Sequence, residues 1–282
     1  MTTGIFFYYQ QGERLRDFPQ VLGDILNHKC VFLFDAHYPS KPESSFDLAP
    51  MPLEAIHNIH TAEMVNRVVE SGCFEGALYS ASGAFEAAKR ICSGELINAF
   101  VFTGYGDHHA GSDFFGGGCY LNGAAIAIRD LRERTTFQRF AVIDTDAHHG
   151  DGSWELFQDD PQVLYICFCS DPSYQENNNV NVRVPMRIDD HDYLKLAQQV
   201  FMEHFKDFRP EIIFWNWGYD GTKGEYGDIG LTSSFHVEMS KLMKQWAAKI
   251  CQGRLLVILC GGHSRELAAS IIPGIIKILV SK

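Results

Sequence analysis

The sequence predicts an α/β protein with a mainly parallel β-sheet flanked by helices. Short, nearly continuous apolar runs alternate with longer segments of helical period. Strands that are apolar on both sides belong in a parallel sheet with helices on both faces. The alternation favours right-handed crossover connections within one sheet. No internal repeat, low-complexity tract or linker divides the 282 residues, so we expect a single domain over 1–282.

The individual elements follow from these two patterns. Six strands are predicted at 30–36, 99–104, 139–146, 163–169, 211–217 and 254–260. Six helices are predicted at 61–71, 82–94, 120–134, 190–207, 234–251 and 265–280. Thr61 is the expected N-cap of the first helix, because its hydroxyl can accept a hydrogen bond from a free backbone N–H.

The chain is acidic, with 35 Asp and Glu against 24 Lys and Arg and a net charge of −11. A general nucleic-acid binder needs a basic footprint, so we expect no direct nucleic-acid partner. An acidic surface suits cationic partners such as lysine-rich tails or polyamines, although acidity also simply keeps proteins soluble. The oligomeric state is left open.

The sequence favours a reducing compartment. It shows neither a basic head followed by an apolar run nor 18 uninterrupted apolar residues, so we expect no secretory signal and no membrane span. The eight cysteines form no CxxC pair, and several lie in apolar runs such as 163–169. Buried free thiols indicate a cytoplasmic protein, with the nucleus as the alternative.

Polar residues gather where four predicted strands end. The strand at 99–104 is followed by His108 and His109, and that at 139–146 runs into Asp-Ala-His-His-Gly-Asp-Gly. The strand at 211–217 leads into Gly-Tyr-Asp, and that at 254–260 into Gly-Gly-His. Parallel sheets bind ligands at the carboxyl ends of their strands. We therefore expect these clusters to form one site.

Asp146, His148 and Asp220 are the predicted ligands of a metal ion. In an extended chain alternate residues share a face, so Asp144, Asp146 and His148 should point the same way. Asp220 is the natural candidate for a carboxylate from another strand. Three N and O ligands leave a fourth position open, as in catalytic zinc sites, and Fe²⁺ or Co²⁺ could also bind. The alternative is that both carboxylates cap helices and the histidine packs.

The adjacent histidines 108 and 109 are weak evidence alone, because a loop histidine pair with satisfied hydrogen bonds explains them equally well. Two further aspartates strengthen the case, since Asp144 and Asp151 could each orient one imidazole of His108 and His109. An oriented histidine beside a cation can act as general base toward water that attacks an amide carbonyl.

Several segments, in order over roughly residues 55–275, resemble the histone deacetylase family. They are NIHTAEMVNRV (58–68), GDHHAGSDFFGGGCYLNGAAIA (106–127), DTDAHHGDG (144–152), FRPEIIFWNWGYDG (208–221) and GDIGLT (227–232). The third segment and the Gly-Tyr-Asp element are highly specific. Through them the chain is identified as a member of this family, within the arginase and deacetylase superfamily.

The resemblance implies an arginase–deacetylase α/β fold with one Zn²⁺ held by Asp146, His148 and Asp220. It also implies that His108 and His109 form a tandem general base and acid pair.

Two further roles come with the family. Asp144 and Asp151 would back the histidine pair, and a structural K⁺ often lies close behind the zinc. By position this K⁺ would use Asp144, Asp146 and His148, with backbone from near Cys167 and Phe168.

The chain departs from the family at His263. Active members end the last core strand with Gly-Gly-Tyr, whose hydroxyl helps to polarise the substrate carbonyl, whereas this chain has Gly-Gly-His at 261–263. The same replacement is found in class IIa-like members of the family, and this resemblance implies poor hydrolysis of acetyl-lysine. Loss of one oxyanion donor can cost ~10²–10³ in rate. Alternatives are that His263 donates through water, makes room for a bulkier acyl group, or changes nothing.

Three further positions bear on the substrate pocket. Gly118 stands where many relatives carry a phenylalanine that lines the acyl-lysine tunnel, so we expect one wall to be missing. Asp107, in Tyr-Gly-Asp in place of Pro-Pro-Gly, is expected to put a carboxylate near the entrance. In the turn-like segment 171–179, Tyr174 could supply an aromatic wall.

The leading hypothesis is a zinc-dependent amidohydrolase that removes an acyl group from a lysine side chain, as in an acylated lysine peptide, or from a small amine such as a polyamine. It would be slow on plain acetyl-lysine if His263 cannot replace tyrosine. The second hypothesis is a catalytically weak acyl-lysine binder that keeps the metal site. A ureohydrolase would need two metal ions bridged by further aspartates, where DTDAHHGDG has histidine and glycine.

Overall fold

The computed structural model describes residues 2–7, 18–23, 30–35 and 45–281. Its strands are β1 Thr2–Phe7, β2 Cys30–Asp35, β3 Phe46–Leu48, β4 Leu96–Val101, β5 Phe140–Asp144, β6 Val163–Cys169, β7 Tyr174–Glu176, β8 Asn179–Arg183, β9 Ile212–Gly218 and β10 Leu255–Gly261. Its helices are α1 Phe18–Leu22, α2 Leu53–His57, α3 Ala62–Glu70, α4 Phe74–Cys92, α5 Gly123–Arg134, α6 Asp151–Phe157, α7 Asp190–Phe208, α8 Ser233–Cys251 and α9 Arg265–Val280.

The strands form one sheet in the order β3-β2-β1-β4-β10-β9-β5-β6-β8-β7. Every neighbouring pair is parallel except β7 with β8, which is antiparallel. The predicted α/β class with a mainly parallel sheet is therefore confirmed. Because β4, β10, β9 and β5 are neighbours, their carboxyl ends meet at the middle of one edge.

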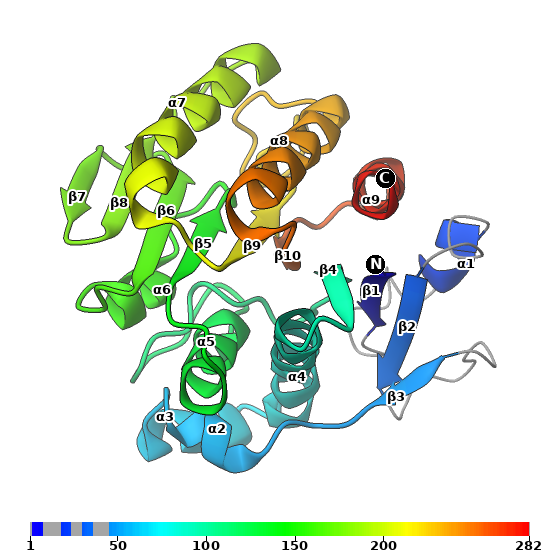
Figure 1. Cartoon of the computed structure of the whole chain (residues 1–282), viewed down its shortest axis with the longest axis vertical. Coiled ribbons are helices and arrows are strands. Elements are labelled where there is room, and N and C mark those ends of the chain that lie inside the picture. Colours follow the sequence, from blue (N-terminus) through cyan, green and yellow to red (C-terminus); the bar gives the residue numbers. More distant parts are fainter. Residues whose placement is uncertain (1, 8–17, 24–29, 36–44, 282) are drawn as a thin grey trace.

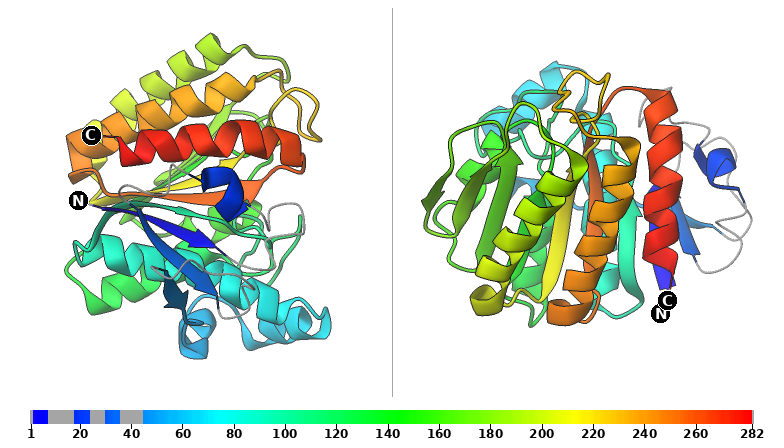
Figure 2. Two further views of the ribbon diagram at one scale, coloured as in Figure 1. Left: turned by 90° about the vertical axis from the view of Figure 1, so that its right-hand side faces the viewer. Right: turned by 90° about the horizontal axis from the view of Figure 1, so that it is seen from above.

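Helices cover both faces of the sheet (Figures 1 and 2). On one face α7, α8 and α9 lie over the strands, and on the other α4 and α5 do. Side chains alternate along each strand. Trp215 and Trp217 of β9 are therefore buried on the face covered by α7, α8 and α9, and Phe214 is buried on the face covered by α4 and α5. Full burial of such a side chain contributes roughly 1.5–3 kcal/mol relative to exposure, which holds the layers together.

Most predicted elements are found, with shifted boundaries. The strand at 163–169 coincides with β6, while β4 runs from Leu96 to Val101 instead of over 99–104. Helix α4 begins at Phe74, whereas the prediction began at 82. The prediction started too late because Gly76 and Ser80 interrupt the apolar pattern of the sequence, although both residues are buried. Thr61 caps α3 as predicted, accepting from the N–H of Met64. Residue 36 of the first predicted strand lies outside the described residues.

Four strands and three helices were not predicted: β1, β3, β7, β8, α1, α2 and α6. Most of them are short, and β7 is exposed along its whole length, so little apolar periodicity marks them. Within the part of the chain that the structure describes, no helix combines the length and apolar character needed to cross a membrane.

Candidate active site

The predicted polar clusters meet above the carboxyl ends of four adjacent strands, in the order β4, β10, β9 and β5. Each cluster lies in the loop that follows its strand: His108 and His109 after β4, Asp146 and His148 after β5, Asp220 after β9, and His263 after β10. Parallel strands explain this convergence, since all of their carboxyl ends lie at one edge.

Asp146, His148 and Asp220 form a compact triad. Nδ1 of His148 lies 3.1 Å from Oδ1 of Asp146 and 2.8 Å from Oδ2 of Asp220. The three ligand atoms all lie within 4.8 Å of one another. Both carboxylates are buried, whereas the His148 side chain is 46% exposed. The triad can therefore hold one cation with an open side toward solvent.

Two observations show that these residues fit a cation. Oδ2 of Asp220 is buried and has no hydrogen bond of regular geometry among the described residues, although His148 lies beside it. A Cβ on either Gly218 or Gly261 would collide with Oδ2 of Asp146, so both glycines keep space beside the carboxylates. Buried carboxylates that face each other are costly without a shared positive charge.

The protonation of the triad supports the same conclusion. Hydrogen bonds to Asp146 and Asp220 raise the pKa of His148 to about 10. Burial, reinforced by the charge of Asp146, raises the pKa of Asp220 to about 7. Without a metal ion a proton would thus neutralise part of the charge. Metal ligands must be deprotonated, so a bound cation would displace this proton.

Each histidine of the tandem pair has its own aspartate. Nδ1 of His108 lies 2.9 Å from Oδ2 of Asp144, which also accepts a hydrogen bond of 2.8 Å from the Tyr165 hydroxyl. Nδ1 of His109 lies 2.6 Å from Oδ1 of Asp151. The structure therefore brings together the two aspartate–histidine pairs that we expected from the sequence. Engagement of Nδ1 leaves Nε2 of each ring for other partners.

The two histidines differ in their electrostatic surroundings. Burial opposes the charged form of His108, but the carboxylates of Asp144 and Asp146 outweigh it and raise its pKa to about 10. Burial and the neighbouring His108 lower the pKa of His109. The rings are 4.1 Å apart, and Nε2 of His108 lies 3.9 Å from Oδ1 of Asp146. Groups whose pKa values are pushed apart can serve as acid and base.

A buried neutral histidine anchors the loop that carries this pair. Nδ1 of His60 lies 2.8 Å from the carbonyl oxygen of Gly111, and its Nε2 accepts from the N–H of Asn122 at 3.0 Å. The Asn122 amide in turn donates to the carbonyl of Ala110 and the hydroxyl of Ser153. Burial lowers the pKa of His60 to about 4, so the ring stays neutral near pH 7.

Asp107 does not lie at the entrance, so that prediction was wrong. Its side chain is buried and accepts hydrogen bonds from the backbone N–H groups of Gly123 and Ala124. These N–H groups begin α5 and have no partner within the helix, so the carboxylate satisfies them. Burial raises the pKa of Asp107 to about 7. The residue ties the histidine loop to α5.

The other two pocket residues remain predictions. Tyr174 is 46% exposed and packs against Trp154, with ring centroids 4.6 Å apart. Gly118 has a φ of +80°, and a Cβ there would meet no atom within 4 Å. Its neighbour Gly117 comes so close to His109 that a Cβ would collide with the ring.

His263 contributes its backbone to the site region. His263 is exposed, and its backbone N–H donates to both carboxylate oxygens of Glu225 at 3.0 Å. The N–H of Ser264 donates to the same carboxylate. Glu225 thus binds the segment after β10 to the loop after β9.

Tyr226 is a site residue that the sequence analysis missed. Its ring stacks on His148, with centroids 5.5 Å apart and planes 25° apart. Its hydroxyl accepts a hydrogen bond of 3.1 Å from the N–H of Gly262. The only signal in the sequence is its place between the Gly-Tyr-Asp and Gly-Leu-Thr elements, which does not tell where a loop side chain points.

A second group of possible ligands was also missed. Nδ1 of His149 lies 3.6 Å from Sγ of Cys167 and 3.6 Å from Sγ of Cys169, and all three ligand atoms lie within 4.8 Å of one another. Alternate residues of β6 put both thiols on one face. The K⁺ expected near Asp144 and the backbone at Cys167 stays a prediction.

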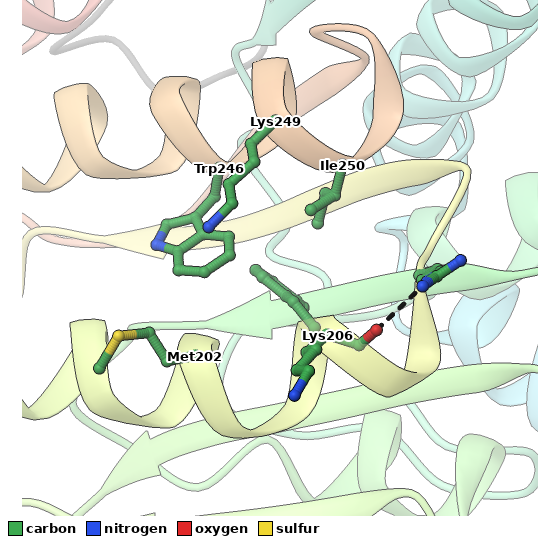
Figure 3. A pocket seen from close by; sticks show the side chains of 7 residues that line it. Met202, Lys206, Trp246, Lys249 and Ile250 are labelled. Atoms are coloured by element: carbon green, nitrogen blue, oxygen red, sulfur yellow. Dashed lines mark hydrogen bonds between the residues drawn. The ribbon is translucent and has the colours of Figure 1, made fainter.

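The surface groove in Figure 3 lies away from these residues. It has a volume of about 550 Å³ and is formed by the C-terminal parts of α7 and α8, before β9 and β10 begin. Its lining consists of Met202, Phe205, Lys206, Arg209, Trp246, Lys249 and Ile250. None of these residues belongs to the clusters at the carboxyl edge.

The chain is similar to known deacetylases. A model of the histone deacetylase domain matches residues 43–279. A probable deacetylase of Archaeoglobus fulgidus is 31% identical over 243 residues, covering 76% of this chain and 67% of that protein. Histone deacetylase HDA1 of Saccharomyces cerevisiae is 26% identical over 74% of this chain, and human histone deacetylase 7 is 28% identical over 66%. The matches cover only 32% and 22% of these two longer proteins.

A solved structure has the same fold. The crystal structure of the HDA15 HD domain superposes with a TM-score of 0.79 and 21% sequence identity. The match covers 99% of this chain and 89% of that one. At this identity the likeness establishes the fold alone.

The triad generates a prediction about metal content. Asp146→Ala should lower zinc affinity by at least ~100-fold, since even changes outside the ligand set cost about 10–100-fold. Zinc per chain after dialysis, measured by mass spectrometry, checks this. Glu238→Gln, which removes an exposed ion-pair partner on α8, is the control and should keep its zinc. Full zinc content in the alanine variant would refute the ligand assignment.

His60 generates a prediction about acid sensitivity. Because its pKa is about 4 when folded and ordinarily near 6.5, the folded state binds fewer protons between these values. Its contribution to stability is therefore complete above about pH 6.5 and is lost as the pH falls toward 4. His60→Gln should shrink the fall in urea midpoint between pH 7 and pH 5, whereas a change at the exposed, non-titrating Met186 (Met186→Gln) should not. Equal falls in both variants would contradict this account.

Proposed function

The chain belongs to the histone deacetylase family, and we propose that it is a zinc-dependent hydrolase that removes acyl groups from lysine side chains or small amines. The observation that carries the proposal is the meeting of two buried carboxylates and one imidazole beside two aspartate-oriented histidines. The open side of the triad, at the half-exposed His148, is where an acyl group would enter.

Asp146, His148 and Asp220 would hold the zinc ion, which supplies polarisation of the substrate carbonyl and a lower pKa for attacking water. All other chemistry falls to the protein. His109, whose pKa is lowered, is suited to take a proton from water. His108, held by Asp144 and raised in pKa, is suited to keep a proton near the leaving nitrogen.

The substrate is proposed to be an acylated amine whose remaining part is cationic. The net charge of −11 and the open side of the triad support a lysine-containing peptide or a polyamine. The second candidate is a weak acyl-lysine binder that keeps the metal. It is favoured by His263, which is exposed at the position where the family carries its hydroxyl donor.

Turnover separates these candidates. The zinc-loaded protein should hydrolyse a trifluoroacetyl-lysine peptide faster than an acetyl-lysine peptide, because fluorine activates the carbonyl. His109→Ala should lower kcat by ~10²–10⁴ while zinc content is unchanged, since the base is lost but no ligand is. Glu238→Gln again serves as the control. Binding of both peptides without any turnover would favour the binder, and full activity of the alanine variant would contradict the base assignment.

A further inference from the structure

We propose that the hydroxyl of Tyr226 is the second donor to the substrate carbonyl, the one that stabilises the negative charge developing on its oxygen. The inference rests on the proposed hydrolase function. It assigns to a loop residue the role expected of the residue after Gly-Gly at the end of β10. Donors aimed at a developing oxyanion are among the largest single contributions to catalysis of acyl transfer.

The position of Tyr226 is the first argument. Its ring stacks on His148, the exposed member of the triad, so it borders the open coordination side. A Cβ on Gly261 would collide with Oδ2 of Asp146 and would lie 3.3 Å from the Tyr226 hydroxyl oxygen. The hydroxyl and this carboxylate therefore face the same small space. A carbonyl oxygen that approaches a cation in the triad would arrive beside the hydroxyl.

The hydrogen bond of the hydroxyl is the second argument. The N–H of Gly262 donates to the phenol oxygen at 3.1 Å, which fixes where that oxygen lies. The oxygen acts there as acceptor, so its own proton stays available as a donor. Tyr226 as a residue is 63% exposed, so a substrate can reach its ring.

The rigidity of the loop is the third argument. The Glu225 carboxylate accepts hydrogen bonds from the backbone N–H groups of His263 and Ser264, which clamps the loop onto the end of β10. On the other side of Tyr226, a Cβ on Gly227 would lie 2.8 Å from Oδ2 of Asp220. Gly227 thus lies close to the site, and the Glu225 clamp on the other side supplies the support that a preorganised donor needs.

A buried chain of hydrogen bonds supports the start of the loop that follows β9. Nε1 of Trp217 donates to Nδ1 of His236 at 3.0 Å, and Nε2 of His236 lies 2.8 Å from the Thr222 hydroxyl. Thr222 in turn donates to the carbonyl of Tyr219 at 2.6 Å. Burial lowers the pKa of His236 to about 3, so its ring stays neutral and this hydrogen-bonded chain adds no charge near the site.

In the reaction, water adds to the carbonyl carbon and gives a proton to His109, while the π electron pair of the carbonyl moves to oxygen. That pair re-forms the C=O double bond as the C–N bond breaks, and the histidine pair returns the proton to the departing amine nitrogen. Tyr226 donates a hydrogen bond to the carbonyl oxygen and keeps its proton throughout. Its contribution is therefore greatest for a carbonyl that is poorly activated.

The first test removes only the hydroxyl. Tyr226→Phe should lower kcat/KM for an acetyl-lysine peptide by ~10²–10³, and for a trifluoroacetyl-lysine peptide by less, with zinc content unchanged. A merely structural role would lower both alike. Tyr120→Phe, which removes a phenol oxygen from a ring packed on Tyr105, is the matched control. A loss with His263→Ala but not with Tyr226→Phe would assign the donor to His263 and overturn the proposal.

The second test reads binding instead of turnover. A peptide that carries a trifluoromethyl ketone in place of the acetyl amide hydrates to a tetrahedral adduct, and its Kd can be measured by calorimetry. Tyr226→Phe should weaken it at least ~10-fold, and His263→Tyr in the Tyr226→Phe background should restore part of the loss. Equal Kd values would overturn the donor. An inactive wild type with Tyr226-dependent binding would instead refute the proposed hydrolase function and leave the donor standing.

Discussion

Two buried carboxylates that face one imidazole impose the constraint on which the rest of the structure depends. Asp146 and Asp220 lie at the ends of β5 and β9 and are almost completely shielded from water, so their mutual repulsion must be offset by a positive charge between them. A proton on His148 offsets it in part, and a divalent cation does so fully. The glycines beside Asp146 and the open side at His148 are what such an ion requires.

Two buried histidines hold the surrounding loops without adding charge to the site. His60 and His236 are each buried and each connect two segments through both ring nitrogens without becoming protonated. Asp107 joins the histidine loop to α5, and burial raises its pKa to about 7, so this carboxyl group is only partly protonated near pH 7. A charge on either of the two histidine rings would change the protonation of the histidine pair through the low dielectric of the interior.

Much of the fold and of the candidate site could be predicted from sequence, because buried parallel strands and a dense motif leave strong local signals. The family predicted from the motif at 144–152 is confirmed by the match over residues 43–279, and the parallel sheet follows from continuous apolar runs. Short or exposed elements such as β7 carry no such signal. Asp107 and Tyr226 could not be placed, because the direction of a loop side chain is decided by contacts with distant segments. Gly262, the partner of Tyr226, lies 36 residues farther along the chain.

The position of β10 in the sheet has a consequence for biosynthesis. This strand lies between β4 and β9, so the middle of the sheet is filled by a strand that is made after both of its neighbours. While a ribosome is still making residues 255–261, the strands on either side have no common neighbour, and each exposes an unpaired edge. The nascent chain must therefore avoid aggregation with its sheet still open between β4 and β9 until residues 255–261 are made.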